Sequence, residues 1–262
     1  MYWFLLLLLT ACSATRQTAT TNVTAPTVIN GKLFATVFQQ RAAEYRALCF
    51  QAYNQARLRV DQSIQPGSSR PMAIITDIDE TVLDNSTYEI HQLMQGKDYE
   101  PASWSEWTSR GEADTVPGAP SFLKYAASKG IRIFYITNRD EKERSGTMKN
   151  LQAFQLPDAD NEHLVMRQGV SSKEDRRLQV MKNFEVLLLI GDNLADFSQA
   201  FDKKTISERQ ENTGQLAAEF GRRFILLPNP VYGDWETSLY QYNGKLTMAQ
   251  KDSIVRAAVK GY

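Results

Sequence analysis

The sequence predicts an α/β fold in which helices cover both faces of a mainly parallel sheet. Two observations predict it: short apolar runs typical of buried strands, and longer helical segments that alternate with them along the chain. The composition agrees, because 42% hydrophobic and 23% charged residues in a chain of 262 are typical of a globular protein with one main domain.

Four apolar runs are predicted to be strands. Each run is short, contains β-branched or aromatic residues, and is bounded by polar residues, Pro or Gly. The predicted strands cover residues 73–75, 131–136, 186–190 and 224–227. The segments between them are long enough for helices, which we predict over residues 119–129, 140–154 and 173–183.

An amphipathic helix is predicted ahead of the first strand. Between Leu33 and Gln62, apolar residues recur at helical spacing, including Phe34 and Leu48. Cys49 lies on the same apolar face, and we interpret it as a small buried hydrophobic residue.

The segment from about residue 84 to 116 does not follow the alternation. We predict that it forms a small helical cap inserted after the first strand. We interpret its tryptophans, Trp104 and Trp107, as packing residues, and Trp235 further along the chain in the same way.

Charge and composition exclude several classes of protein. The 30 basic residues are balanced by 30 acidic ones, so the chain lacks the basic surplus with which proteins bind nucleic-acid polymers. Two cysteines and two histidines are too few for a Cys/His zinc site or a disulfide scaffold. Any chemistry must therefore rest on carboxylates, hydroxyls and amines.

The N-terminus is predicted to direct export and to carry a lipid anchor. Residues 1–11 contain an apolar run that is too short to span a bilayer and is typical of a signal peptide. Leu9 to Cys12 resembles the bacterial lipobox, so we expect Cys12 to be lipidated and to anchor the mature protein. An ordinary cleaved signal with an incidental cysteine is the alternative. Ser13, in place of an aspartate, favours the outer membrane, with the domain on its periplasmic or outer face.

Residues 12–30 are predicted to be a tether between the anchor and the folded domain. They are rich in Ser, Thr, Ala and Asn and have no apolar periodicity. The folded domain is then expected over residues 31–262.

Polar clusters directly follow three of the predicted strands. They are residues 76–81, 137–139 and 191–197. Ligands of open α/β sheets bind at the carboxyl ends of the strands, so we expect these clusters to converge. Three polar clusters at three strand ends indicate a functional site far more strongly than one Asp-x-Asp pair does.

The carboxylates of these clusters predict a magnesium site. Several carboxylates brought together repel one another unless a cation neutralises them, and oxygen ligands without nearby His or Cys favour Mg²⁺. Asp192 and Asp196 are four residues apart, so on a helical turn both carboxylates would lie on one face. Of the remaining pair, Asp77 and Asp79, one could be a nucleophile and the other a proton donor, which suits phosphoryl transfer.

Donors for phosphate oxygens are also present. Thr137 offers a hydroxyl, and Lys173 follows Ser172, a candidate cap at the N-terminus of a predicted helix, where anions are favoured.

The motifs resemble those of the haloacid dehalogenase superfamily. Within it, they are most similar to the four-aspartate branch, the class C bacterial acid phosphatases of the outer-membrane lipoprotein e family. The resemblance covers residues 33–262 and rests on four motifs, at 77–81, 136–139, 172–173 and 191–197, with neighbouring similarities at 83–86, 116–119 and 229–235. It implies a Rossmann-like haloacid dehalogenase core and a phosphatase domain.

The resemblance implies a two-step phosphoryl transfer. Asp77 would attack phosphorus in line and form an aspartyl-phosphate, while Asp79 would protonate the leaving oxygen and then activate water. Thr137 and Lys173 would hold the phosphoryl oxygens. An acidic optimum would follow if Asp79 must start protonated.

The resemblance also implies the metal ligands. Mg²⁺ would be bound by Asp77, by the backbone carbonyl of Asp79 and by Asp192, with Asp196 close to the waters of the metal.

The resemblance implies small phosphomonoesters as substrates, above all nucleoside 5′-monophosphates. Tyr99 and Tyr232 match the two aromatic residues between which a base would stack, and packing roles are the alternative for both. Two other functions stay open: a phosphotransferase, in which an alcohol replaces water, and a non-catalytic surface binding protein on the same fold. A homodimer is also left open.

Overall fold

The computed structural model describes residues 27–63 and 70–262. The predicted signal peptide, the lipidation site Cys12 and most of the predicted tether lie outside the described residues. Among the helices of the described ranges, none is both long and apolar enough to cross a membrane.

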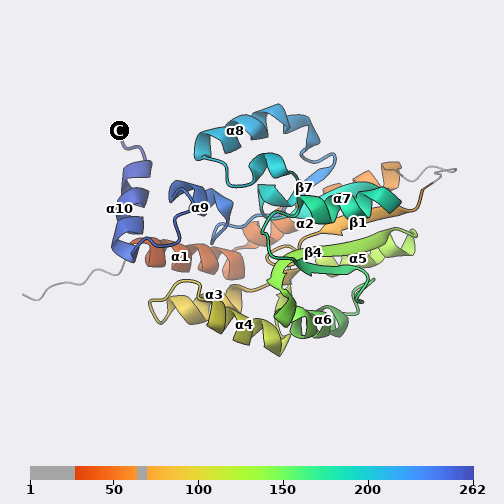
Figure 1. Cartoon of the computed structure of the whole chain (residues 1–262), viewed down its shortest axis with the longest axis horizontal. Coiled ribbons are helices and arrows are strands. Elements are labelled where there is room, and N and C mark those ends of the chain that lie inside the picture. The colour runs from red at the N-terminus through yellow and green to blue at the C-terminus, as the bar shows by residue number, and fades with distance from the viewer. Residues whose placement is uncertain (1–26, 64–69) are drawn as a thin grey trace, which may run out of the picture.

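A parallel sheet of five strands forms the centre of the described chain, in the order β5-β4-β1-β6-β7 (Figure 1). The strands are β1 (Met72–Thr76), β4 (Arg132–Asp140), β5 (Leu164–Arg167), β6 (Glu185–Gly191) and β7 (Phe224–Leu226). Four of them coincide with the predicted strands, which confirms the predicted α/β class. The fifth, β5, was not predicted, because it is a four-residue edge strand with only alternate residues buried.

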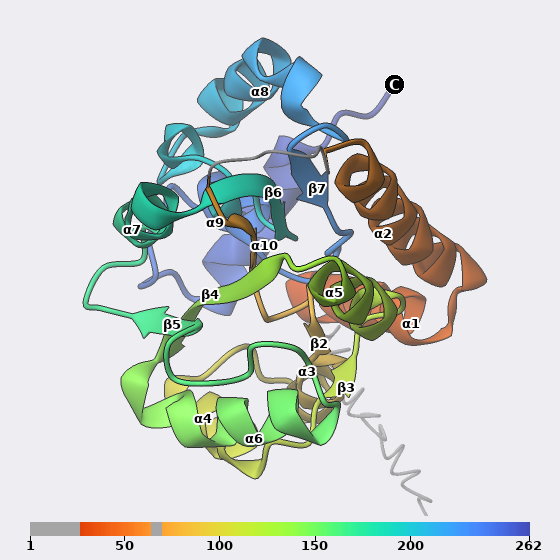
Figure 2. The same ribbon diagram turned by 90° about the vertical axis from the view of Figure 1, so that its right-hand side faces the viewer.

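Helices cover both faces of this sheet (Figure 2). On one face, α2 (Ala43–Ser63) and α5 (Ala119–Ser128) pack against a large apolar cluster that includes Ile74, Ile133 and Ile190. On the other, α7 (Glu174–Asn183) and the chain from Phe197 to Phe220, which contains α8 (Ile206–Gln215), cover Ile75 and its neighbours. Successive residues of β1 thus face opposite helix layers, which explains why its run is continuously apolar.

The helix predicted over residues 33–62 is two helices, α1 (Thr27–Arg41) and α2. The prediction was also wrong about part of the buried face, since Phe34 is 78% exposed and Leu48 is exposed as well. The physical reason is that α1 buries three polar side chains, Lys32, Thr36 and Gln39. Lys32 pairs with the cap and with α9 (Asp234–Leu239), Gln39 donates to Asp84, and Thr36 donates to the carbonyl of Lys32 in its own helix. Cys49 in α2 is fully buried in the core, as predicted.

The start of α1 also corrects the boundary of the predicted tether. Residues 27–30 are helical, and Val28 and Ile29 are buried. The backbone amides of Thr27 and Val28 both donate hydrogen bonds of 2.8 Å to the carboxylate of Asp252 in α10 (Met248–Ala258). A carboxylate at a helix N-terminus satisfies free amides and complements the helix dipole, so this helix belongs to the folded domain.

The inserted segment holds two helices, α3 (Ser86–Leu93) and α4 (Pro101–Arg110). A two-stranded ribbon of β2 (Leu83–Asp84) and β3 (Asp114–Thr115) brings its two ends together. Pro101 and the side chain of Glu100, which accepts hydrogen bonds from two backbone amides, begin α4. In Figure 1 the insert lies beside α1 and α6 (Arg144–Ala153), next to the sheet edge that carries the polar clusters.

The remaining helical segments lie after β4 and in the C-terminal part of the chain. Two of them border the cavity described below: the short helix η2 (Leu194–Asp196) and α9 (Asp234–Leu239). Three others are η1 (Glu141–Glu143), η3 (Gln199–Phe201) and η4 (Ala217–Glu219).

Candidate active site

Asp77 lies at the carboxyl end of the central strand, between the ends of β4 and β6. Its backbone amide donates a hydrogen bond of 2.8 Å to the carbonyl of Ile190 in β6, so the main chain at this aspartate is fixed by the sheet. The ammonium group of Lys173 donates to Asp77 Oδ1 and, over 2.7 Å, to Asp196 Oδ1. All three side chains are nearly inaccessible to solvent, so the ion pairs form in a low-dielectric environment.

The electrostatics of this cluster favour a bound cation. Burial is the main cause that raises the pKa of Asp77 to about 7. Attraction by Lys173 lowers this pKa, and repulsion by Asp196 and Asp79 raises it further. Burial, together with Asp196 and Asp77, also raises the pKa of Asp192 well above its ordinary value. One lysine therefore does not balance the carboxylates that surround it.

Three carboxylates could together bind a metal ion. Oxygen atoms of Asp77, Asp192 and Asp196 all lie within 4.8 Å of one another. Three negative charges beside one Lys173 leave a surplus that a divalent cation would balance, and an all-oxygen donor set suits a hard cation. The residues therefore fit a divalent metal ion.

The convergence of Asp192 and Asp196 depends on a turn rather than on an α-helix. Asp196 is the last residue of η2, and its carboxylate accepts a hydrogen bond of 3.0 Å from the amide of Asn193. This bend brings the side chain against Gly191, where a Cβ atom would lie 2.3 Å from Asp196 Oδ2. A glycine at 191 is thus a steric condition for the cluster.

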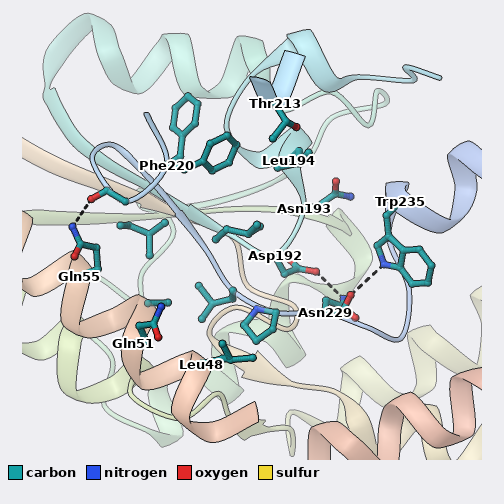
Figure 3. A pocket seen from close by; sticks show the side chains of 18 of the residues that line it. Leu48, Gln51, Gln55, Asp192, Asn193, Leu194, Thr213, Phe220, Asn229 and Trp235 are labelled. Carbon is teal, nitrogen blue, oxygen red and sulfur yellow. Dashed lines mark hydrogen bonds between the residues drawn. The ribbon is translucent and has the colours of Figure 1, made fainter. Parts of the chain in front are cut away.

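The carboxylate of Asp192 is held by hydrogen bonds from two side chains. Asn229 Nδ2 donates a hydrogen bond of 2.8 Å to Asp192 Oδ2, and the hydroxyl of Thr81 donates one of 3.2 Å to Oδ1. Figure 3 shows Asn229 between Asp192 and Trp235, whose indole nitrogen donates to the Asn229 carbonyl over 3.1 Å. These three residues line a mainly apolar cavity of about 860 Å³ that is also lined by β7.

The carboxylate of Asp79 is outside this cluster and is held by one residue of β4 and one of the inserted segment. Arg139, at the end of β4, forms an ion pair of 2.7 Å with Asp79 Oδ1, and Asn85 Nδ2 donates to the same oxygen over 2.9 Å. Asp79 Oδ2 has a single longer contact, 3.2 Å from Arg139 Nε, among the described residues. Whether the Asp79 carbonyl binds a metal stays a prediction.

A cavity of about 550 Å³ opens over these carboxylates. Tyr99, which is 56% exposed, and Trp104 border it on the cap side, with ring centroids 6.1 Å apart. The guanidinium carbon of Arg139 lies 5.6 Å from the Trp104 ring centroid, a cation–π geometry that joins the cap to Asp79. Trp104 packs against Tyr88, as predicted, and also borders the cavity, whereas Trp235 is 46% exposed, so its interpretation as a packing residue was wrong.

Tyr232 also borders the cavity, but its hydroxyl is engaged elsewhere. It donates a hydrogen bond to the carboxylate of Glu80, the residue next to Asp79. Glu80 has a φ of +54°, a strained conformation for a residue with a side chain, and its carboxylate accepts the backbone amide of Asn85 over 2.8 Å. Burial raises the pKa of Glu80 well above its ordinary value.

Thr137 is placed differently from the prediction, whereas Lys173 lies where it was expected. Thr137 is fully buried, its hydroxyl accepts the amide of Arg139 over 3.1 Å, and it is not among the described residues that line the cavity. Lys173 lines the cavity and lies at the N-terminus of α7, as predicted; it occupies the N-cap position itself, and the hydroxyl of Ser172 accepts a hydrogen bond of 3.3 Å from the amide of Glu174. Attraction to Asp196 and Asp77 raises the pKa of Lys173 although burial opposes it.

Sequence reasoning assigned no role to four polar residues that hold this site. Three of them, Arg139, Asn85 and Asn229, support Asp79 or Asp192, and the fourth, Arg176, donates to the carbonyl of Thr137 over 2.6 Å. The signal for Arg139 was present, since it lies two residues after Thr137 at a strand end. Nothing in the local sequence marks Arg176, which lies inside α7.

Sequence and structure comparisons now identify the family. The family model described as HAD superfamily, subfamily IIIB (Acid phosphatase), matches residues 5–235. The chain belongs to this family. The resemblance predicted from the motifs is thus confirmed.

Solved acid phosphatases share the fold. The class C acid phosphatase from Bacillus anthracis matches with a TM-score of 0.86 and 40% identity, over 90% of this chain and 99% of that chain. A structure of the class C acid phosphatase from Bacillus anthracis with tungstate bound matches equally well at 38% identity. Acid phosphatase 1 of Solanum lycopersicum is 23% identical over 180 residues, and the match spans 62% of its length, less than two thirds.

Proposed function

We propose that the protein is a Mg²⁺-dependent acid phosphatase that hydrolyses small phosphomonoesters, with nucleoside 5′-monophosphates as its main substrates. The observation that carries the proposal is the set of three clustered carboxylates around one buried lysine at the end of β1, in a chain of the acid phosphatase family. The Bacillus anthracis structure with tungstate bound supports an oxyanion ligand.

Asp77 is the proposed nucleophile. Its backbone is fixed by β6, its carboxylate lines the cavity, and Lys173 beside it can bind a phosphoryl oxygen. A bound divalent cation would supply Lewis-acid polarisation of the phosphoryl group. Lys173 would keep the same group oriented while Asp77 attacks phosphorus in line and the leaving oxygen departs opposite it.

Asp79 is the proposed proton donor. Arg139 and Asn85 crowd Oδ1 with three donor contacts of 2.7–3.0 Å, while Oδ2 has one contact of 3.2 Å. Oδ2 is therefore the oxygen suited to give a proton to the leaving group and to take one from water in the second step.

Base stacking on Tyr99 and Tyr232 is part of the proposal. Both line the cavity above the carboxylates, and flat aromatic faces accept any base. We also propose that Cys12 carries a lipid that anchors the domain at the outer membrane, since Leu9 to Cys12 resembles the lipobox.

A substrate panel tests the proposed function. Wild-type protein and Asp77→Asn are assayed with p-nitrophenyl phosphate and with 5′-nucleotides, 3′-nucleotides and sugar phosphates, with and without EDTA. We expect hydrolysis by the wild type that EDTA abolishes, a preference for 5′-nucleotides, and no turnover by the folded variant. Turnover by Asp77→Asn would contradict the nucleophile, and transfer to an added alcohol would favour a phosphotransferase.

A further inference from the structure

The cavity above the carboxylates extends away from them to a second, charged end. The residues there come from α1, α3, α9, α10 and the segments that follow α3 and α9, and they belong to none of the four motifs. The residues of this distal end are Lys32, Glu89, Asp98, Glu236, Tyr240 and Lys251.

Most charged groups at the distal end are paired with one another. Lys32 Nζ lies 2.8 Å from Asp98 Oδ1 and 3.0 Å from Glu236 Oε2, and Lys251 Nζ lies 3.0 Å from Asp98 Oδ2. Asp98 also accepts the backbone amide of Tyr99 over 2.9 Å. This network fixes the backbone at Tyr99, which lines the same cavity.

Glu89 is the exception in this network. It is only 6% exposed, yet among the described residues its carboxylate has no hydrogen bond or ion pair, although it lines the cavity. Burial is the main cause that raises the pKa of Glu89 to about 7. Attraction by Lys32 lowers this pKa, and repulsion by Asp98 and Glu236 raises it. The oxygens of Glu89 are not among the fully buried, unpartnered side-chain atoms of the described residues, so they reach the cavity and can accept a hydrogen bond from a donor on a ligand there.

The charge count at the distal end indicates the character of that donor. Three carboxylates, Glu89, Asp98 and Glu236, face two ammonium groups, Lys32 and Lys251. When Glu89 is ionised, the surplus is negative, which favours a donor with positive character over an oxygen acceptor. The aromatic rings of Tyr99, Tyr232 and Tyr240 on the same cavity favour a flat ring.

We propose that the distal end is a subsite for the leaving group, in which Glu89 accepts a hydrogen bond from an amino group carried by a flat ring. This inference rests on the proposed function and deepens it. It makes Glu89 a specificity-determining residue that favours aminated over carbonyl-bearing bases, because a carbonyl oxygen at that position would meet a carboxylate.

Two pairs of nucleotides that differ in this group test the subsite. AMP and CMP carry an amino group where IMP and UMP carry a carbonyl oxygen. We expect wild-type kcat/KM to favour the amino member of at least one pair by about tenfold above neutral pH. Glu89→Gln, whose amide can both donate and accept, should remove that preference. Glu112→Gln, an exposed carboxylate elsewhere in the cap, should keep it.

The outcomes separate this inference from the proposed function. Hydrolysis of p-nitrophenyl phosphate with no preference within either pair would overturn the subsite while the phosphatase activity stands. An unchanged preference in Glu89→Gln would do the same. If the wild type hydrolyses no phosphomonoester, the proposed function fails, and calorimetric binding of AMP against IMP still decides whether Glu89 selects the amino group.

Discussion

Arg139 Nη2 lies 2.7 Å from Asp79 Oδ1, although the two residues are 60 positions apart in the chain. The same guanidinium packs against Trp104 of the cap, and its Nη1 donates a hydrogen bond of 3.0 Å to the hydroxyl of Thr147. Arg139 thus joins the sheet, the cap and the proposed proton donor. The orientation of Asp79 depends on a residue from a different strand.

Arg139→Met should lower kcat by about two orders of magnitude, because Asp79 would lose the ion pair that orients it for proton transfer. The effect should be larger for alkyl phosphates than for p-nitrophenyl phosphate, whose leaving group needs no proton. Steady-state kinetics with both substrates measures this difference. Equal losses for both leaving groups would contradict an action through Asp79 and indicate a direct contact with phosphate.

Lys173→Met should lower kcat/KM by at least about two orders of magnitude, because it removes the only ammonium group that contacts Asp77 in the described chain. Tungstate, added as an inhibitor, should bind more weakly for the same reason. Inhibition constants and kcat/KM are measured together. Lys182→Met is the matched control, since Lys182 is an exposed residue of the same helix; a similar loss in this variant would show that the effect is structural.

The fold was more predictable than the contacts inside the site. Strands such as 186–190 are continuous apolar runs, and the aspartates at their ends follow the rule that parallel strands present ligands at one edge. Polar burial, in contrast, has no periodic signature. In α1 the buried face carries Lys32 and Gln39, so the apolar residues of the sequence did not mark it. Glu89 and Arg176 are polar residues without a distinguishing pattern in the sequence, and their surroundings are set only by the fold.

Gly191→Ala should impair the proposed metal site without changing a residue that is proposed to contact the substrate. The added Cβ would lie 2.3 Å from Asp196 Oδ2, so the carboxylate must move away from Asp77 and Asp192. We expect the Mg²⁺ concentration for half-maximal activity to rise about tenfold or more. Gly214→Ala is the control, because a Cβ there meets nothing within 4 Å. Unchanged Mg²⁺ dependence in Gly191→Ala would mean that Asp196 does not support the metal.

Glu89→Gln should stabilise the fold at high pH. The pKa of Glu89 is raised from an ordinary value of 4.5 to about 7, so between these values the folded state binds more protons than the unfolded state. The free energy of unfolding of the wild type therefore falls as the pH rises from about 4.5 to 7, and the cost stays above that range. The variant should gain about 2 kcal/mol at about pH 8 and close to nothing at about pH 4.5.

Urea unfolding of the wild type, Glu89→Gln and Glu112→Gln at both pH values measures this gain. Glu112→Gln should show no pH-dependent difference, because its carboxylate is exposed in both states. A Glu89→Gln variant less stable than the wild type at high pH would mean that the carboxylate is already paired within the chain. A gain there, combined with loss of the amino-group preference, would mean that the chain keeps a destabilising carboxylate because it binds the leaving group.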